Sequence, residues 1–327
     1  MDESCRYSYE ENNKPAKFLA ADVAALTGEM LAEMYPKSAI KLLAGCAPCQ
    51  PFSSYSLGKT EKRDARWRLL SEFGRLVSEL QPEIVTMENV PKAERHLVFR
   101  RFVKELRALD YSVDYAIIDC TEYGIPQSRK RLVLLASRLG SISLRPIDPK
   151  RDRPRTVKTV IGKLEKLIAG GISNRDPLHR ASSVSDVNMR RLKASIPGGT
   201  WRDWERSLVA NCHRTESGET FPGVYGRMTW NAPAPTITTQ FFGFGNGRFG
   251  HPEQDRALSL REGAILQTFP ETYRFVKPGD QVHFKSIGKM IGNAVPVRLG
   301  QVIGESIVAH VQSAKRKTSV KRIKTRR

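Results

Sequence analysis

Short, mostly apolar runs recur along the first 136 residues of the chain, each bounded by glycine, proline or charged residues. Their lengths of four to seven residues are typical of buried strands. The first run ends in a turn at Asp22, and the second leads into a loop that holds Pro48 and Pro51. We predict strands at residues 18–24, 40–44, 84–87, 115–118 and 132–136.

Amphipathic stretches separate these runs. Apolar residues recur at steps of three and four over residues 69–80 and 97–109, which predicts two helices, and a shorter helix is expected over 27–34. Strands that alternate with helices predict an α/β fold with a mostly parallel sheet covered by helices.

The pattern becomes irregular after residue 145. Residues 146–235 are rich in Arg, Pro, Gly and Ser and carry weak periodicity, which predicts a second, irregular and basic domain. Within it we interpret Trp201 and Trp204 as core residues rather than as base-stacking residues. A strand is then expected over 234–239.

The last third of the chain returns to periodic patterns. A helix is predicted over 258–269 with Arg261 and Glu262 exposed, then a loop over 291–296 and a helix that ends near Val311. The domain organisation that follows has a first domain over 1–148, a second over 149–285, a return to the first over 286–312 and a disordered basic tail over 313–327.

The composition indicates the class of binding partner and the cellular compartment. The 327 residues include 54 Lys and Arg against 34 Asp and Glu, a net charge of +20, which indicates a polyanionic partner, above all nucleic acid. The five cysteines are few and irregularly spaced, which argues against a secreted disulfide framework. No apolar run reaches 18 residues, so no membrane span is expected.

One cysteine lies where a nucleophile would be useful. Cys49 follows a predicted strand, in a turn stiffened by Pro48 and Pro51, and a single cysteine held in this way is a candidate nucleophile. The alternative is a small buried residue, because free cysteine is among the most buried types.

Glu88 and the pair Arg129 and Arg131 also lie at predicted strand ends. Because the carboxyl ends of parallel strands converge, these groups and Cys49 are expected to share one pocket. A thiolate, a carboxyl and two guanidinium groups suit attack on an electron-poor ring. Taken singly, Glu88 would be a solvated strand end and the arginines a phosphate patch.

Five motifs in order resemble those of the (cytosine-5) DNA methyltransferase family. The matching stretches are the nucleophile loop at 45–53, Glu88-Asn89-Val90, Gln-x-Arg-x-Arg at 127–131, Arg-Glu…Leu-Gln-Thr-Phe-Pro at 261–270 and Ile-Gly-Asn-Ala-Val-Pro at 291–296.

The resemblance implies a fold and an activity. The fold is that of class I S-adenosylmethionine-dependent methyltransferases, a Rossmann-like sheet joined to a target-recognition domain. The activity is transfer of the methyl group of S-adenosyl-L-methionine to C5 of a flipped-out cytosine in double-stranded DNA, through a covalent adduct between a cysteine and C6.

It also implies roles for single residues. Cys49 would attack C6, Glu88 would protonate or hydrogen-bond N3, and Arg129 and Arg131 would hold the base and the carboxyl group. The residues implied to contact the substrate are Gln50, Ser53, Asn89 and Gln127, and those implied to contact the cofactor are Asp22, Pro48, Leu69, Asn293 and Val295.

The chain departs from the family pattern in two places. It lacks the opening Phe-x-Gly-x-Gly turn and the acidic residue after the second strand, so we expect an N-terminal piece to be missing, together with the first strands. It also has Cys46-Ala47 where the family has a small residue and proline, a change expected to have little effect.

Two other functions stay open: an RNA cytosine C5-methyltransferase, and a catalytically inactive remnant that binds nucleic acid. For the favoured function we expect a monomer of the bacterial cytoplasm, associated with the nucleoid and paired with a cognate restriction endonuclease. No metal is expected, because Cys46-x-x-Cys49 has no second pair at zinc spacing.

Overall fold

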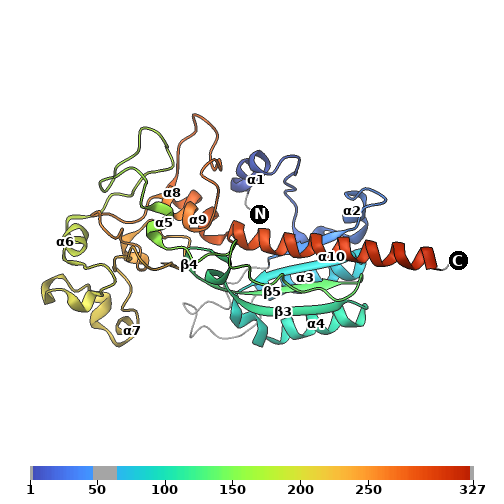
Figure 1. Ribbon diagram of the computed structural model, residues 1–327. Coiled ribbons are helices and arrows are strands. Elements are labelled where there is room, and N and C mark those ends of the chain that lie inside the picture. Colours follow the sequence, from blue (N-terminus) through green and yellow to red (C-terminus); the bar gives the residue numbers. More distant parts are fainter. Residues whose placement is uncertain (1–2, 47–64, 325–327) are drawn as a thin grey trace.

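The computed structural model describes residues 3–46 and 65–324, arranged around one mixed sheet (Figure 1). Its order is β1-β2-β5-β3. The strands are β1 (Leu42–Gly45), β2 (Ile84–Asn89), β3 (Ser112–Asp119) and β5 (Lys130–Ser137). The predicted α/β fold is confirmed, and all four of these strands lie at or beside predicted positions.

The direction of β5 is what the sequence pattern did not show. β1 pairs with β2 in parallel, whereas β5 lies between β2 and β3 and is antiparallel to both. Three of the four strands therefore run in one direction and β5 runs against them, so two of the three pairings are antiparallel and the sheet is mixed rather than mostly parallel.

Alternate residues of β5 face two different layers, because side chains on a strand point to opposite faces in turn. Leu132, Leu134 and Ala136 pack with α3 (Ala65–Leu80) and α4 (Leu97–Ala108). Val133 and Leu135 pack with α10 (Val297–Lys324), which crosses the opposite face (Figure 1). The sheet is thus covered on both sides.

The middle of the chain has short helices and long connections. Its helices are α5 (Val157–Ile161), α6 (Asp186–Ala194), α7 (Glu216–Glu219), α8 (Leu260–Leu266) and α9 (Phe284–Asn293). Trp201 and Trp204 are buried in one of its hydrophobic clusters, which confirms their interpretation as core residues.

A second cluster in this region packs Ile287 and Ile291 of α9 against residues of α5 and α8. This cluster crosses position 285/286, where we expected a domain boundary, and the division of the chain into domains stays a prediction. A two-stranded sheet of β4 (Gln127–Ser128) and β6 (Ala234–Pro235) joins the middle region to the residues just before β5.

Several local predictions were wrong. Residues 18–22 form no strand, and Asp22 caps the short 3₁₀ helix Val23–Ala25, because in the described chain β1 is the edge of the sheet and nothing pairs beyond it. The strand expected over 234–239 is only the two residues of β6. The remaining N-terminal helices are α1 (Arg6–Asn12) and α2 (Gly28–Glu33), the second close to its predicted position.

The helix boundaries near the C-terminus also differ from prediction. α9 reaches Asn293, into the stretch expected to be a loop, and α10 continues to Lys324 rather than ending near Val311. The lysines and arginines after Val311 are good helix formers, so the helix can continue without an apolar face to bury.

The prediction that Arg261 and Glu262 are exposed was wrong as well. Glu262 is 1% exposed, caps α8 together with Ser259, and accepts two 2.7 Å hydrogen bonds from the buried Arg256. Arg261 binds Asp176. Burial alone would raise the pKa of Glu262, but the Arg256 guanidinium outweighs it and lowers that pKa to about 2. Helical periodicity cannot show an ion pair that compensates a buried charge.

His251 lies beside this pair and is held in its neutral form. Its Nδ1 accepts hydrogen bonds from the backbone N–H groups of Glu253 and Gln254 at 3.1 and 2.9 Å, so a proton on Nδ1 would remove an acceptor. Burial lowers the pKa of His251 to about 4, although the charge of Glu262 acts in the other direction.

A second buried carboxylate ties three segments together. Asp152 is fully buried and accepts hydrogen bonds from Arg145 at 2.7 and 2.8 Å, from Arg298 at 2.7 Å and from the backbone N–H of Asp148 at 2.8 Å. The Arg145 hydrogen bonds hold the pKa of Asp152 well below its usual range. The exit of β5, the following loop and the start of α10 are thereby joined.

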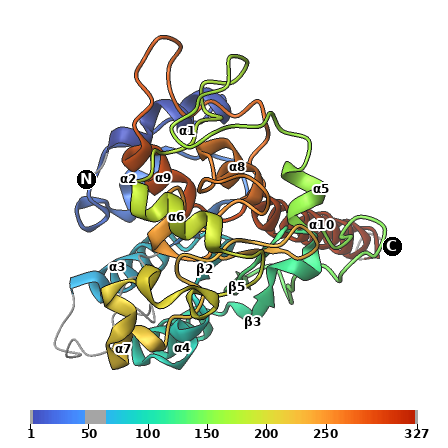
Figure 2. The same cartoon turned by 90° about the vertical axis from the view of Figure 1, so that its left-hand side faces the viewer.

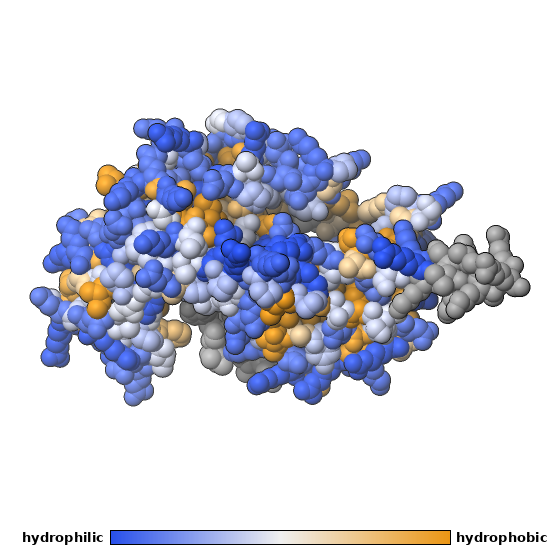
Figure 3. Space-filling model, viewed as in Figure 1, coloured by the Kyte–Doolittle hydropathy of each residue, from blue (hydrophilic) through white to orange (hydrophobic). Residues whose placement is uncertain are grey.

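Cations gather on the outside of this junction. Figure 3 shows strongly hydrophilic residues over the start of α10, in the middle of the face drawn. A cavity of about 390 Å³ there is lined by basic side chains: Lys150, Arg151, Arg153, Arg155 and Arg298.

Replacing Asp152 by alanine is expected to lower the free energy of unfolding by about 3 kcal/mol, because two partly buried guanidinium groups lose their buried carboxylate. Chemical denaturation measures the loss. Asp114→Ala, at an exposed position of β3, is the matched control and should change stability by less than about 0.5 kcal/mol. Equal effects of the two substitutions would contradict the role of Asp152.

Acid is expected to weaken the fold through His251. Its ordinary pKa is 6.5 and its folded pKa about 4, so between these pH values the unfolded chain binds a proton that the folded chain does not. Stability is then lost as the pH falls from 6.5 towards 4, by up to about 1.4 kcal/mol per pH unit. Urea unfolding of wild type and His251→Gln at several pH values should show their difference shrinking towards pH 5; a constant difference would contradict this assignment.

Candidate active site

Glu88 and Arg131 meet at one edge of the sheet because two strands run in opposite directions. β2 ends at Asn89, and β5 begins beside that end, with Asn89 paired to Leu132. Arg129 therefore precedes β5 and Arg131 lies at its start, instead of either residue ending a strand, which corrects the reasoning from converging carboxyl ends. They reach the predicted edge because β5 is antiparallel.

The Glu88 carboxyl has a partner at each oxygen. The Nε of Arg131 lies 2.7 Å from Oε1, and the Cys46 thiol donates to Oε2 at 3.1 Å. Glu88 is only 8% exposed. Oε1 accepts no aligned hydrogen bond from the described residues, so it retains acceptor capacity beside the guanidinium. The pair is a nearly buried, polarised group, and its arginine lines a groove.

Gln127 was expected to contact substrate, but its side chain is fully buried. Its Oε1 accepts from the backbone N–H of Ile237 at 2.8 Å and from Arg129, while its Nε2 donates to Leu266 O and to Gln267 Oε1. Gln127 has no exposed amide atom and is bonded to Arg129, whose Nη1 also donates to Ile237 O.

A groove of about 840 Å³ opens where the sheet edge meets the middle region. The middle region, seen towards the viewer in Figure 2, lies in front of β2 and β5. Residues from both parts line the groove, including Arg129, Arg131, Thr236, Arg248 and Asn293. The predicted pocket therefore has an observed counterpart for the two arginines.

The other predicted positions have more varied environments. Asn89 is buried, and its Oδ1 accepts from the backbone N–H of Val90. Asn293 is exposed and lines the groove, while Leu69 and Val295 are half-buried, on α3 and just before α10. Asp22 accepts from the backbone N–H of Ala24 at 3.0 Å. The predictions for Pro48, Cys49, Gln50 and Ser53 lie outside the described residues.

Cys46 makes a contact that the sequence did not reveal. Its thiol contacts Glu88, whereas we expected its presence to have little effect. The parallel register pairs Gly45 with Met87, so Cys46 and Glu88 come one step later on neighbouring strands. The register would have predicted the contact between Cys46 and Glu88, but it can be read only once the strand pairing is known.

Burial raises the pKa of the Cys120 thiol to about 11, which makes Cys120 a poor nucleophile.

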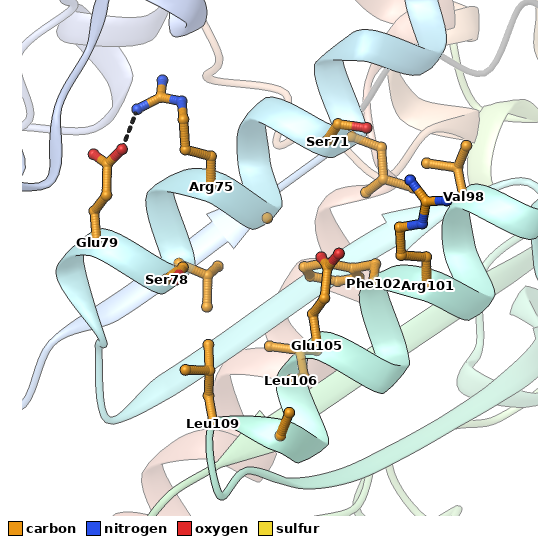
Figure 4. Close-up of a pocket in the computed structure, with 14 residues that line it drawn as sticks. Ser71, Arg75, Ser78, Glu79, Val98, Arg101, Phe102, Glu105, Leu106 and Leu109 are labelled. Atoms are coloured by element: carbon orange, nitrogen blue, oxygen red, sulfur yellow. Dashed lines mark hydrogen bonds and ion pairs between the residues drawn. The ribbon is translucent and has the colours of Figure 1, made fainter.

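Another hollow lies away from this edge. A cavity of about 600 Å³ between α3 and α4 is lined by residues such as Gly74, Phe102 and Glu105, and by no predicted site residue (Figure 4).

Within residues 3–46 and 65–324, no group of three His, Cys, Asp or Glu side chains could hold a metal ion. No helix in those ranges is both long and apolar enough to cross a membrane.

The Gln127 network supports a stability prediction. Gln127→Met keeps the side-chain volume but leaves the Ile237 N–H and the Leu266 carbonyl without their partner, which should cost about 1–3 kcal/mol. Thermal unfolding checks this, with Gln301→Met on the exposed side of α10 as control. If both variants unfold like wild type, the amide is not needed to join the two regions.

Comparisons with known proteins point to one family. The model of the family described as C-5 cytosine-specific DNA methylase matches residues 1–309. The Type II methylase M.HgiDII of Herpetosiphon aurantiacus is 49% identical over 309 residues, covering 94% of this chain and 86% of that protein. The Type II methyltransferase M1.BsuMI of Bacillus subtilis is 30% identical over 316 residues, covering 93% and 71%.

The fold has solved counterparts. The S. pombe Dnmt2 methyltransferase superposes with a TM-score of 0.57 at 17% identity, covering 95% of this chain and 89% of that one. At this identity the likeness shows the fold alone, and it confirms the predicted class I methyltransferase architecture.

Proposed function

The chain belongs to the family of C-5 cytosine-specific DNA methylases, and on that premise we propose the chemistry by which it methylates cytosine in double-stranded DNA. The observation that carries the proposal is the buried Glu88–Arg131 pair at the edge of a groove. A carboxyl fixed by a guanidinium is suited to hold the N3 and N4 edge of a pyrimidine.

The reaction needs a nucleophile because C5 of cytosine is unreactive while the 5,6 double bond is intact. We propose that the Cys49 thiolate adds to C6, and that Glu88 delivers a proton to N3 as the electron pair of the double bond moves towards C5 and the ring. Once C5 carries the methyl group, water accepts the C5 proton, the electron pair of that C–H bond re-forms the 5,6 double bond, and the C6–S bond breaks to release the Cys49 thiolate while N3 returns its proton to Glu88. S-adenosyl-L-methionine would supply the electrophilic methyl group.

Arg131 and Arg129 have different parts in this proposal. Arg131 touches Glu88 and lines the groove, so it can hold both the carboxyl and the base. Arg129 is 5% exposed and bonded to Gln127 and Ile237, so it fixes the wall of the groove and keeps positive charge behind the base. Asn89 and Gln127 are then positioning residues.

The base must leave the duplex to reach Glu88, at a cost of a few kcal/mol. A groove of about 840 Å³ has room for one nucleotide, and Lys92 and Arg248 add cations to its lining. We propose that residues 149–285 read the target sequence, and that phosphates contact the outward cations and the basic end of α10.

The residues proposed for the cofactor suit its adenosine end. Asp22 offers a carboxylate for a ribose hydroxyl or the adenine amino group, Leu69 and Val295 offer apolar contact, and Asn293 lies on the groove wall. Pro48, which belongs to the same proposed set, directly precedes Cys49 in the sequence.

The Type II names of the relatives favour a restriction–modification setting, with a cognate endonuclease as the functional partner. We propose a monomer that acts at the bacterial nucleoid. An RNA cytosine methyltransferase would use the Glu88–Arg131 pair in the same way, whereas a binding-only role would leave the pair without this chemistry. The test therefore includes both alternatives.

The test measures transfer of labelled methyl groups to duplex DNA and to RNA of the same sequence. We expect transfer to DNA, with Glu88→Gln lowering the rate by about 100-fold or more and the exposed Glu122→Gln serving as control. A 5-fluorocytosine duplex should form a covalent adduct that Cys49→Ser abolishes.

Other outcomes would separate the alternatives. Transfer to RNA alone would replace the proposed substrate. DNA binding without any transfer or adduct would support the inactive remnant, and an adduct that persists in Cys49→Ser would remove Cys49 from the mechanism.

A further inference from the structure

The Cys46 thiol lies on the proposed catalytic carboxyl, although the reaction gives it no role. We propose that Cys46 is a positioning residue that sets the orientation of the Glu88 carboxyl by donating a hydrogen bond to Oε2. The inference rests on the proposed function of Glu88 and deepens it.

The two contacts of Glu88 act on different oxygens. Arg131 approaches Oε1 to 2.7 Å, and Cys46 Sγ lies 3.1 Å from Oε2. A carboxyl held at one oxygen can still rotate about its terminal torsion, which is broad in energy. A second contact at the other oxygen restricts that rotation. Oε1, which accepts no aligned hydrogen bond from the described residues, then keeps a fixed direction.

The backbone at the end of β1 fixes the position of the Cys46 side chain. Cys46 follows β1, whose parallel register with β2 sets it beside Glu88. The preceding Gly45 packs so closely against the Phe73 ring of α3 that a Cβ at this position would lie 2.7 Å from the ring. Close packing on one side and strand pairing on the other therefore fix where residue 46 begins.

The chemistry of the side chain also fits this role. A thiol is a weak donor, and a hydroxyl at the same position would donate to the same oxygen, whereas a methyl group could not. Cys46 is exposed while Glu88 is buried, so the thiol covers the Oε2 atom of a buried carboxyl. The conservative serine variant should therefore keep the function that alanine loses.

Steady-state kinetics of the full chain on duplex DNA test the inference. Cys46→Ala should lower kcat by about tenfold, the order expected for a hydrogen bond to a charged group, with KM for DNA changed less than about twofold. Cys46→Ser should recover kcat to within about threefold of wild type. Cys212→Ala, at another exposed cysteine, is the control and should behave as wild type.

A double-mutant cycle assigns the effect to Glu88. In a Glu88→Gln background, Cys46→Ala should change kcat less than about twofold, because the group that it positions is altered. Each of three outcomes would overturn the inference: an unchanged kcat in Cys46→Ala, a serine variant as slow as the alanine variant, or fully multiplicative effects in the cycle.

Crystal structures of wild type and Cys46→Ala give a readout that needs no activity. The Glu88 carboxyl should be rotated or should adopt two orientations in the variant; a single unchanged orientation would overturn the inference. If wild type transfers no methyl group while the carboxyl does rotate, the proposed function fails and the positioning contact stands.

Discussion

The contact between Glu88 and Arg131 depends on one strand that runs against its neighbours. β5 is antiparallel to both β2 and β3, so the residues at its start lie at the edge where β2 ends. With β5 reversed to run parallel, Arg131 would lie at the opposite edge, about a strand length from Glu88. The candidate site follows from this topology more than from any single motif.

Buried carboxylates held by arginine recur in this strongly basic chain. Glu88, Asp152 and Glu262 are each at most 8% exposed, and each is bound by a guanidinium. A buried charge is costly unless it is paired with good geometry. Each pair holds a junction: the site edge, the start of α10 or the first turn of α8. Other cations face outwards, where a polyanion can reach them.

The groove is built by joining two regions whose cores are separate. Sheet residues pack with α3, α4 and α10, while the middle region has its own clusters. The buried amide of Gln127 bonds to Gln267 and Ile237, across the short β4–β6 pairing. Because both amide ends are used, the Gln127 side chain joins the two regions beside the groove. Its contact with substrate stays a prediction.

The sequence by itself determined the α/β class, the approximate strands and main helices, and the residues that carry the family's motifs. These depend on local periodicity and on side-chain chemistry, which are present in the chain before it folds. It could not determine the direction of β5, the buried ion pair between Glu262 and Arg256, or the contact of Cys46 with Glu88. Each depends on which segments become neighbours, and hydrophobic patterns record which faces are buried without recording what lies opposite.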